Sequence, residues 1–381
     1  MRVLVLNYEF PPIGGGGGAV SKAIACHLVQ LGAEVQVLTA HWGDLPRVEE
    51  IDGYTVHRTL SLRQYPDRCR VREMFSYFVL SILPALRLAR RWQPDIVHAH
   101  FAVPVGPLGY LIKKLLDIPY IITLHGGDVP GFDDPQTEQW YRLLLPLTRP
   151  IWKNAAAIVA VGQGLRDLAK DAYPDVPVSI IRNGIDCATY RPPTRERSDD
   201  RESTLVFVGR IVKQKGLSYL IRGLPELRRR VSKSFKLNIV GDGPLRPELE
   251  SLVAELGVGD CVNFVGWVSQ EEVRRYLHEA DIFVLPSLME GLSIALLQAM
   301  ASGLPLVTSD AVGNRDVVHH DENGFVVPAR DVGALIAALA VLVDDADLQK
   351  RMGEASLRLS EPYDWSVISQ TYFQLLKRHA K

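Results

Sequence analysis

Short apolar runs rich in β-branched residues alternate along the chain with longer stretches in which apolar residues recur every three or four positions. The short runs predict strands buried on both faces, and the longer stretches predict helices between them. Such alternation is typical of parallel sheets covered by helices. The expected strands span residues 3–6, 35–39, 96–99, 120–124, 157–161 and 178–181, and then 205–208, 237–240, 262–265, 282–285, 306–308 and 325–327.

The two series of strands predict an α/β chain with two doubly wound, Rossmann-like domains. Residues 191–203 lie between the series and contain two prolines and many charges, which indicates a solvated linker. We expect the domains to cover residues 1–182 and 183–362. A last helix is expected within residues 363–381.

Composition narrows the class of protein. The 381 residues carry a net charge of −1, which argues against nucleic acid as the main partner. The four cysteines form no CxxC pair, so a zinc site or a disulfide framework is not expected. The apolar N-terminal run is stopped by two prolines, and no run reaches the ~18 residues of a membrane span. We therefore expect a cytoplasmic protein.

Residues 281–309 hold the most informative candidate site. An apolar strand ends at Pro286, a short loop presents Glu290, and a helix is expected to begin near Ser293. Free amides at a helix start suit a phosphate, and a nearby carboxylate can accept hydrogen bonds from hydroxyl groups. The segment therefore indicates a site for a phosphorylated sugar.

A run of five glycines, Gly14 to Gly18, lies between the first strand and a helix expected from Ala19 to Leu31. Glycine lets the backbone approach a ligand closely and turn its amides toward an anion. The run could instead be a flexible connector or a G-x-G-x-x-A dinucleotide fingerprint. The fingerprint turns directly after its strand, whereas seven residues intervene here, and no acid follows the second strand.

Other polar residues also follow expected strands. His125 and Asp128 close a strand of the first domain, at the sheet edge where ligands bind. Arg210 and Lys215 follow the first strand of the second domain, where two cations could neutralise a departing diphosphate. Residues 241–244 form a glycine-rich turn before a helix. Each also has a structural interpretation, as a packed histidine, a solvated basic turn or an ordinary tight turn.

Together these segments resemble the retaining glycosyltransferases of family 4, which have the GT-B architecture of two Rossmann-like domains facing across a cleft. The family pattern is a Glu, seven residues and a second Glu; here Glu290 takes the first place and Gln298 the second. The resemblance implies transfer of a hexose from a nucleoside diphosphate sugar to a sugar or lipid-linked acceptor hydroxyl, without a metal or another cofactor. The commonest setting in the family is cell-envelope or exopolysaccharide assembly.

The resemblance also implies roles for single residues. The first domain would bind the acceptor, with a C-terminal helix crossing back onto it, and the second would bind the nucleotide sugar. Catalytic roles fall on His125, Glu290, Arg210 and Lys215, and a weaker acceptor contact falls on Asp128. The implied donor-binding residues are Gly15, Gly16, Gly17, Gly209, Asp242, Gly243, Val265, Gly266, Leu292, Ser293, Ile294 and Gln298.

Gln298 stands where the second Glu of the family binds both ribose hydroxyls. A glutamine offers one acceptor oxygen and a donor amide in place of two acceptors. We expect this exchange to weaken donor binding by on the order of 1 kcal/mol, which is a several-fold effect.

Residues 63–91 suggest a separate surface, because seven arginines flank the apolar stretch 75–86. A basic helix with an apolar, aromatic face could make peripheral contact with an anionic membrane. The alternative is an ordinary helix packed on the first sheet. His98 and His100 have near metal-ligand spacing without an acid partner, and we interpret them as packing or acceptor-side residues rather than as a metal site.

Three alternatives differ in class. A GT-B sugar-nucleotide epimerase or phosphorylase would use the same residues but release an epimerised or phosphorolysed product. A dehydrogenase would bind NAD at the first-domain glycines. A non-catalytic nucleotide-sugar-binding protein would bind the donor without turnover, and Gln298 is the residue that favours it.

Overall fold

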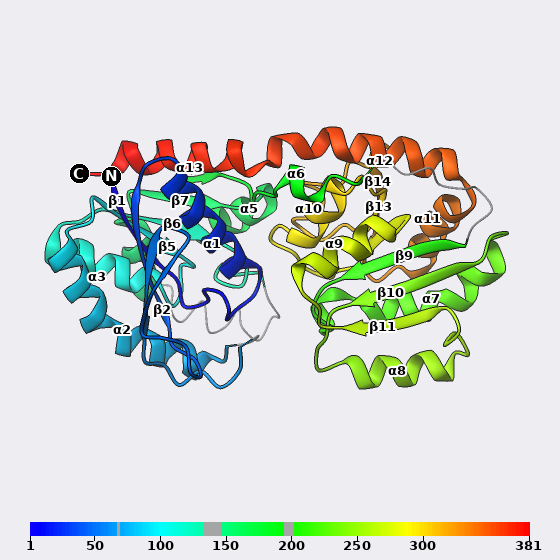
Figure 1. Ribbon diagram of the computed structural model, residues 1–381, viewed down its shortest axis with the longest axis horizontal. Helices are drawn as coiled ribbons and strands as arrows, with labels where there is room; N and C mark the ends of the chain where they lie inside the picture. Colours follow the sequence, from blue (N-terminus) through cyan, green and yellow to red (C-terminus); the bar gives the residue numbers. More distant parts are fainter. Residues whose placement is uncertain (67–68, 133–145, 194–201) are drawn as a thin grey trace. The chain divides into compact units, whose positions relative to one another are not determined.

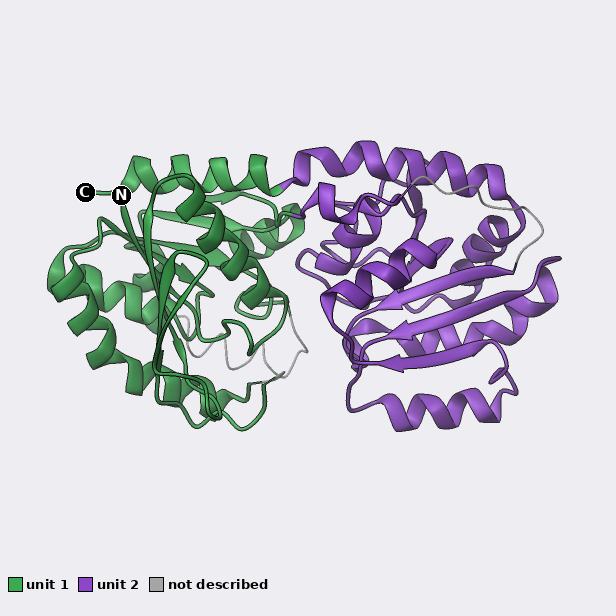
Figure 2. Cartoon of the chain, in the orientation of Figure 1, with its two compact units in different colours: residues 1–184, 365–381 green, residues 185–364 purple. Residues whose placement is uncertain are grey.

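The computed structural model describes residues 1–66, 69–132, 146–193 and 202–381. The chain divides into two compact units (Figure 2). Unit 1 contains Met1–Gly184 together with Trp365–Lys381, and unit 2 contains Ile185–Asp364. The central part of the expected linker, residues 194–201, lies outside the described residues.

Unit 1 is built on an eight-stranded sheet with the order β3-β4-β2-β1-β5-β6-β7-β8. Figure 1 labels strands β1, β2, β5, β6 and β7 of this sheet. Its pairs are parallel except for β3 with β4. The strands are β1 (Arg2–Leu6), β2 (Glu34–Ala40), β3 (Val48–Ile51), β4 (Tyr54–Thr59), β5 (Ile96–His100), β6 (Tyr120–Leu124), β7 (Ala157–Ala160) and β8 (Val178–Ile180). The described helices of unit 1 include α1 (Gly16–Gln30), α2 (Val71–Trp92), α3 (Gly106–Leu116), α5 (Gln163–Ala172) and α13 (Trp365–His379).

Unit 2 is built on a six-stranded sheet with the order β11-β10-β9-β12-β13-β14, all parallel. Its strands are β9 (Ser203–Val208), β10 (Phe235–Val240), β11 (Val262–Gly266), β12 (Ile282–Leu285), β13 (Leu306–Ser309) and β14 (Gly324–Val327). Its described helices are α6 (Cys187–Tyr190), α7 (Leu217–Arg230), α8 (Arg246–Glu255), α9 (Gln270–Glu279), α10 (Ile294–Ala301), α11 (Val332–Asp344) and α12 (Ala346–Ser360), with 3-10 turns η1 (Lys213–Lys215) and η2 (Glu361–Tyr363).

Every strand predicted from the apolar runs is present, and the central strands fill the interior of each sheet. Val3–Leu6 are fully buried, as are Ile282–Leu285. The antiparallel hairpin of β3 and β4 was not predicted, since β3 is short and half polar. Its signal was the Asp52-Gly53 pair, whose φ angles of 49° and 83° match a tight hairpin turn.

Among the parallel strands, the chain order reverses once in each sheet, and a ligand is expected to bind at each of these two reversals. In unit 1 the reversal lies between β1 and β5, and in unit 2 between β9 and β12. In open α/β sheets, ligands bind beyond the carboxyl ends of the strands at such a switch point. A binding site is therefore expected in the loops that follow β1, β5, β9 and β12.

Candidate functional site

The carboxyl edge of the unit 2 sheet collects most of the predicted donor-side residues. Four neighbouring parallel strands, β11, β10, β9 and β12, end there side by side. The residues at or after these ends are Val265, Gly266, Asp242, Gly243, Gly209, Arg210 and Glu290. Tertiary pairing thus brings together segments that are far apart in the sequence.

Two of these loops touch through their backbones. A Cβ placed on Gly241 would lie 2.0 Å from the carbonyl oxygen of Gly209, and Gly241 also has a φ of +134°. A Cβ on Gly243 would lie 2.4 Å from the carbonyl oxygen of Ile211. The glycines after β10 are therefore required for packing, because any side chain would force the loops apart.

The central feature of the unit 2 edge is an ion pair between Lys215 and Glu290. Lys215 Nζ lies 2.5 Å from Glu290 Oε1, and the two side chains are only 16% and 7% exposed. Ser287 Oγ donates to the same carboxylate oxygen at 2.7 Å. The loop after β12 and the turn η1 after β9 are thus held together by charge across the switch point. Arg210, directly after β9, is an exposed residue.

The same two loops are also joined by the side chain and backbone of Gln214. Gln214 Nε2 donates to the carbonyl of Met289 at 3.0 Å, and Leu288 N donates to the carbonyl of Gln214 at 2.7 Å. Gly313 N donates to the carbonyl of Glu290 at 2.9 Å. Glu290 is therefore fixed on both its backbone and its side chain, as a positioned functional carboxylate requires.

The helix that follows Glu290 begins where it was expected. Ser293 is the N-cap of α10, and Ile294 is its first residue. Leu292 and Ser293 are buried, with exposed fractions of 6% and 5%. Their position at the start of α10 matches the predicted phosphate-binding loop, whose function remains a prediction.

Gln298 makes specific contacts within unit 2. Its Nε2 donates to Tyr190 Oη at 2.7 Å and to Gln270 Oε1 at 2.9 Å, and Tyr190 Oη donates to Gln270 Oε1 at 3.3 Å. Burial raises the pKa of Tyr190, so its hydroxyl keeps its proton at neutral pH. The amide of Gln298 is thus used as a donor, a role that a glutamate could not take.

In unit 1 the glycine run is part of a helix rather than a connector. Helix α1 begins at Gly16, not at Ala19 as the sequence suggested, and Gly15 is its N-cap. A Cβ on Gly17 would lie 2.5 Å from Cζ of Phe101 and 3.3 Å from Cγ of His125. The start of α1 is thus packed against the loops after β5 and β6, and this packing is the physical reason for the early start.

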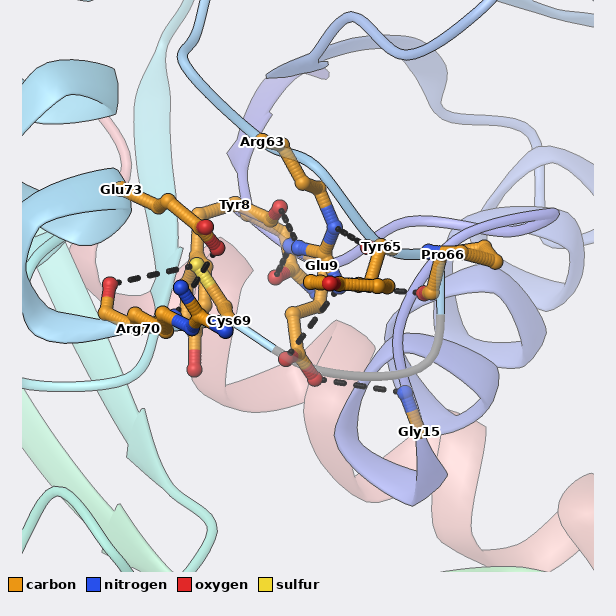
Figure 3. A network of polar contacts seen from close by, with 10 residues as sticks. Tyr8, Glu9, Gly15, Arg63, Tyr65, Pro66, Cys69, Arg70 and Glu73 are labelled. Atoms are coloured by element: carbon orange, nitrogen blue, oxygen red, sulfur yellow. Dashed lines mark hydrogen bonds and ion pairs between the residues drawn. The ribbon is translucent and has the colours of Figure 1, made fainter. Parts of the chain in front are cut away.

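A buried arginine holds the loop in front of α1 (Figure 3). Arg63 is 8% exposed and donates to the carbonyl oxygens of Tyr8, Tyr65 and Pro66 at 3.3, 2.9 and 3.1 Å. Its Nη2 lies 3.8 Å from Glu9 Oε1. Arg63 therefore does not belong to an outward-facing basic surface, which corrects the interpretation of residues 63–91.

Glu9 is a candidate that the sequence interpretation missed. Its Oε2 accepts a hydrogen bond from Gly15 N at 3.3 Å, so a carboxylate already lies against the N-terminus of α1 (Figure 3). A phosphate at Gly15 would meet this negative charge. A ligand hydroxyl, which can donate to a carboxylate, suits the position better.

A cluster of three histidines lies at the carboxyl ends of β5 and β6. His125 Nε2 and His100 Nδ1 share a hydrogen bond of 3.0 Å, and His98 Nε2 is bonded to Thr123 Oγ1 at 2.8 Å. Burial lowers the pKa of His98 and of His125 to about 3, and it lowers the pKa of His100 well below its usual value. All three rings are neutral at pH 7, and His100 fixes the orientation of His125.

Asp128 holds the two loops that flank this cluster. Its carboxylate accepts from the backbone amides of Ala102, His125 and Gly126 at 2.7, 3.0 and 2.9 Å, and the residue is 4% exposed. Burial raises the pKa of Asp128 while the amides act in the opposite direction. These bonds give Asp128 a positioning role, and its acceptor contact stays a prediction.

Arg246 is a second residue that the sequence did not indicate. Its guanidinium carbon lies 5.8 Å from the centre of the Phe264 ring, and its Nη2 donates to the Phe264 carbonyl at 3.4 Å. A Cβ on Gly266 would lie 3.2 Å from Arg246 Nη1. The turn predicted to hold the nucleoside base therefore has an arginine against it.

Within the described ranges, no three or more His, Cys, Asp or Glu side chains are grouped so that they could hold a metal ion.

Solved structures with a similar overall fold identify the fold class of this chain. Sucrose-phosphate synthase from Thermosynechococcus elongatus is 20% identical with a TM-score of 0.86, and the match covers 99% of this chain and 98% of that one. Anabaena HepE in complex with UDP is 18% identical with a TM-score of 0.78, covering 99% and 100%. These neighbours confirm the predicted GT-B fold.

Sequence comparison identifies the family. Glycosyltransferase Family 4 matches residues 14–189, and Glycosyl transferases group 1 matches residues 193–358. Alpha-D-kanosaminyltransferase from Streptomyces kanamyceticus is 30% identical over 72% of this chain and 75% of the relative. Glycogen synthase from Mycobacterium tuberculosis is 28% identical over 98% and 94%. The chain belongs to the family 4 glycosyltransferases of GT-B architecture, as the sequence motifs predicted.

Proposed function

We propose that the protein transfers a hexose from a nucleoside diphosphate sugar to a hydroxyl group of a sugar or lipid-linked acceptor, with retention at the anomeric carbon and without a metal ion. The observation that supports this best is the Lys215–Glu290 ion pair at the switch point of unit 2. This pair supports the proposal because it holds a cation, which suits a diphosphate, and a fixed carboxylate, which suits sugar hydroxyls, in two adjoining loops. The UDP and UDP-glucose in structures of the neighbour HepE support a nucleotide-sugar donor.

In this reaction the bond between the anomeric carbon and the diphosphate oxygen breaks, and a bond from the acceptor oxygen to the same face of that carbon forms. The acceptor proton passes to the departing diphosphate. Lys215 and Arg210 neutralise the negative charge that develops on the diphosphate. Glu290 accepts hydrogen bonds from sugar hydroxyls, and the amides at Leu292, Ser293 and Ile294 hold the phosphate.

The remaining residues bind and orient the two substrates. Unit 2 holds the nucleoside at the backbone turns of Gly209, Asp242–Gly243 and Val265–Gly266, with Gln298 beside the ribose. Unit 1 binds the acceptor. From unit 1, Gly15, Gly16 and Gly17 at the start of α1 also contact the donor, and the neutral ring of His125, fixed by His100, faces the donor sugar.

We place the reaction in cell-envelope or exopolysaccharide assembly, at the cytoplasmic face of a membrane. Relatives named for amylovoran and colanic acid biosynthesis support this setting. No helix in the described parts of the chain combines the length and apolar character that crossing a bilayer requires. A non-catalytic nucleotide-sugar-binding protein is the second candidate, because Gln298 is bonded to Tyr190 and Gln270 inside unit 2.

Thermal denaturation with UDP, GDP, ADP and NAD, each with and without EDTA, tests the donor site. A ligand at about 100 times its Kd is expected to add about 2.7 kcal/mol to the free energy of unfolding. We expect one nucleoside diphosphate to raise Tm regardless of EDTA. Product analysis by NMR with the matching sugar nucleotide then shows whether the anomeric configuration is retained. A rise with NAD alone contradicts the proposal, and binding without turnover favours the second candidate.

Gln298→Glu is expected to preserve donor affinity or to raise it several-fold, because a carboxylate accepts from both ribose hydroxyls. The free protein should lose about 1 kcal/mol of unfolding free energy, since the hydrogen bond donated to Gln270 Oε1 is removed. Calorimetric titration measures the affinity, and urea denaturation measures the stability.

Tyr190→Phe is the matched control, because it removes one partner of Gln298 and leaves residue 298 itself unchanged. If Gln298→Glu lowers donor affinity more than about tenfold while Tyr190→Phe does not, the glutamine amide itself contacts the donor. The prediction that a glutamate at position 298 binds the ribose at least as well is then wrong.

A further inference from the structure

Helix α2 has an inverted distribution of polar and apolar residues. The residues it buries include Glu73, Ser76, Tyr77 and Ser81, whereas five of its large apolar residues are exposed. These are Val71, Phe75, Val79, Leu80 and Leu83, with exposed fractions of 82%, 66%, 45%, 42% and 61%. We name these five residues the α2 ridge. A helix on a soluble surface normally has the opposite arrangement, so the ridge indicates a partner.

The buried side of α2 is held by polar contacts, which explains the inversion. Tyr77 Oη donates to the carbonyl of Leu38 at 3.3 Å, and Ser81 Oγ shares a hydrogen bond of 2.8 Å with Thr59 Oγ1. Ser76 Oγ accepts from Leu62 N at 2.9 Å. Because these bonds fix the rotation of α2 against the sheet, the apolar residues cannot turn inward.

The exposed charges of α2 itself have one sign. Arg72, Arg87, Arg90 and Arg91 of α2 are all exposed. The one acidic residue of α2, Glu73, is 1% exposed and accepts from the backbone amide of Arg70. Its outward surface therefore combines apolar side chains with arginines, a pairing typical of helices that lie in the headgroup region of anionic lipid.

We propose that the α2 ridge docks on the surface of an anionic phospholipid bilayer, with Phe75 and Leu83 below the headgroups and the arginines of α2 against lipid phosphates. A second copy of this chain fits less well, because a two-fold contact through α2 would bring the arginines of both copies together. The inference depends on α2 alone, so it stands or falls separately from the transferase reaction.

Vesicle co-sedimentation tests the proposal. The full chain is expected to bind phosphatidylglycerol–phosphatidylcholine vesicles and not pure phosphatidylcholine vesicles, and added salt should weaken the binding. Phe75→Asp with Leu83→Asp should reduce the partition coefficient at least about tenfold. Arg87→Glu with Arg90→Glu should also do so, since each arginine near an anionic surface contributes about a fivefold increase. Val341→Asp with Val367→Asp, at residues 49% and 50% exposed on other helices, is the matched control.

A second measurement does not depend on disruptive variants. In Phe75→Trp, the emission of the introduced tryptophan should shift to shorter wavelength with anionic vesicles, compared with the parent protein. Equal binding to both vesicle types, or unchanged binding in both the Phe75→Asp/Leu83→Asp variant and the Arg87→Glu/Arg90→Glu variant, overturns the proposal. Concentration-dependent dimerisation in analytical ultracentrifugation that Phe75→Asp abolishes would show that a second copy covers the ridge instead.

Discussion

Lys215→Ala is expected to lower kcat/KM for sugar transfer about a hundredfold or more, the effect of removing a preorganised group that stabilises developing charge. Lys215 Nζ lies 2.5 Å from Glu290 Oε1 in a mostly buried pair. The substitution therefore removes the proposed cation for the diphosphate and also releases the Glu290 carboxylate. Steady-state kinetics with the nucleotide sugar identified by thermal denaturation measures the effect.

Lys213→Ala is the matched control, because Lys213 lies in the same turn η1 but is exposed. It should change kcat/KM by less than about twofold, as expected of a solvated charge. Glu290→Gln keeps the size of the side chain and should also reduce transfer, while nucleoside diphosphate binding is largely retained. Equal losses for Lys215→Ala and Lys213→Ala would show that only general positive charge is needed, against the assigned role of Lys215.

Gly17→Ala is expected to reduce transfer at least about tenfold and to destabilise the protein by about 1–3 kcal/mol, the range for inserting a methyl group into a packed site. The new Cβ would meet the Phe101 ring at 2.5 Å and the His125 ring at 3.3 Å. Both rings must move, and His125 then loses its orientation. Kinetics and urea denaturation measure the two effects.

Gly15→Ala provides the comparison within the same glycine run, because a Cβ there has no neighbour within 4 Å. It should leave the free energy of unfolding nearly unchanged. Since most of the expected donor contacts lie in unit 2, the Tm rise with nucleoside diphosphate should survive in Gly17→Ala. Loss of that rise would show that the nucleoside diphosphate depends on the start of α1, and equal destabilisation by the two variants would contradict a packing requirement at Gly17.

The fold was predictable because strands that are buried on both faces consist almost entirely of apolar residues. Strands such as Ile282–Leu285 are buried on both faces, so they must be continuous apolar runs. The hairpin of β3 and β4 leaves a weaker mark, since the residues of β3 alternate between exposed and half-buried positions. The start of α1 was misplaced because five glycines carry no helical preference. Packing against Phe101 and His125 set that boundary instead.

The candidate site was predictable only in part. Residues in the loops just after a strand, such as Glu290 and Arg210, could be assigned to the sheet edge because parallel strands bring their carboxyl ends together. Hydrogen-bond and ion-pair partners that come from distant segments of the chain could not be predicted. Tyr190 and Gln270 bond Gln298 from two other helices, and Arg63 reaches Glu9 from another loop.

By itself, the sequence determined the class of this protein: two doubly wound units, the family 4 motifs, and a loop that presents Glu290 before a helix. These features are local, since apolar runs and turn residues act through neighbouring backbone. Only the tertiary structure decided which charges are paired, which histidines are neutral, and which way α2 faces. Those properties depend on burial and on contacts between distant segments. Arg63 is therefore buried and bonded to backbone carbonyls, whereas Phe75 and Leu83 are exposed.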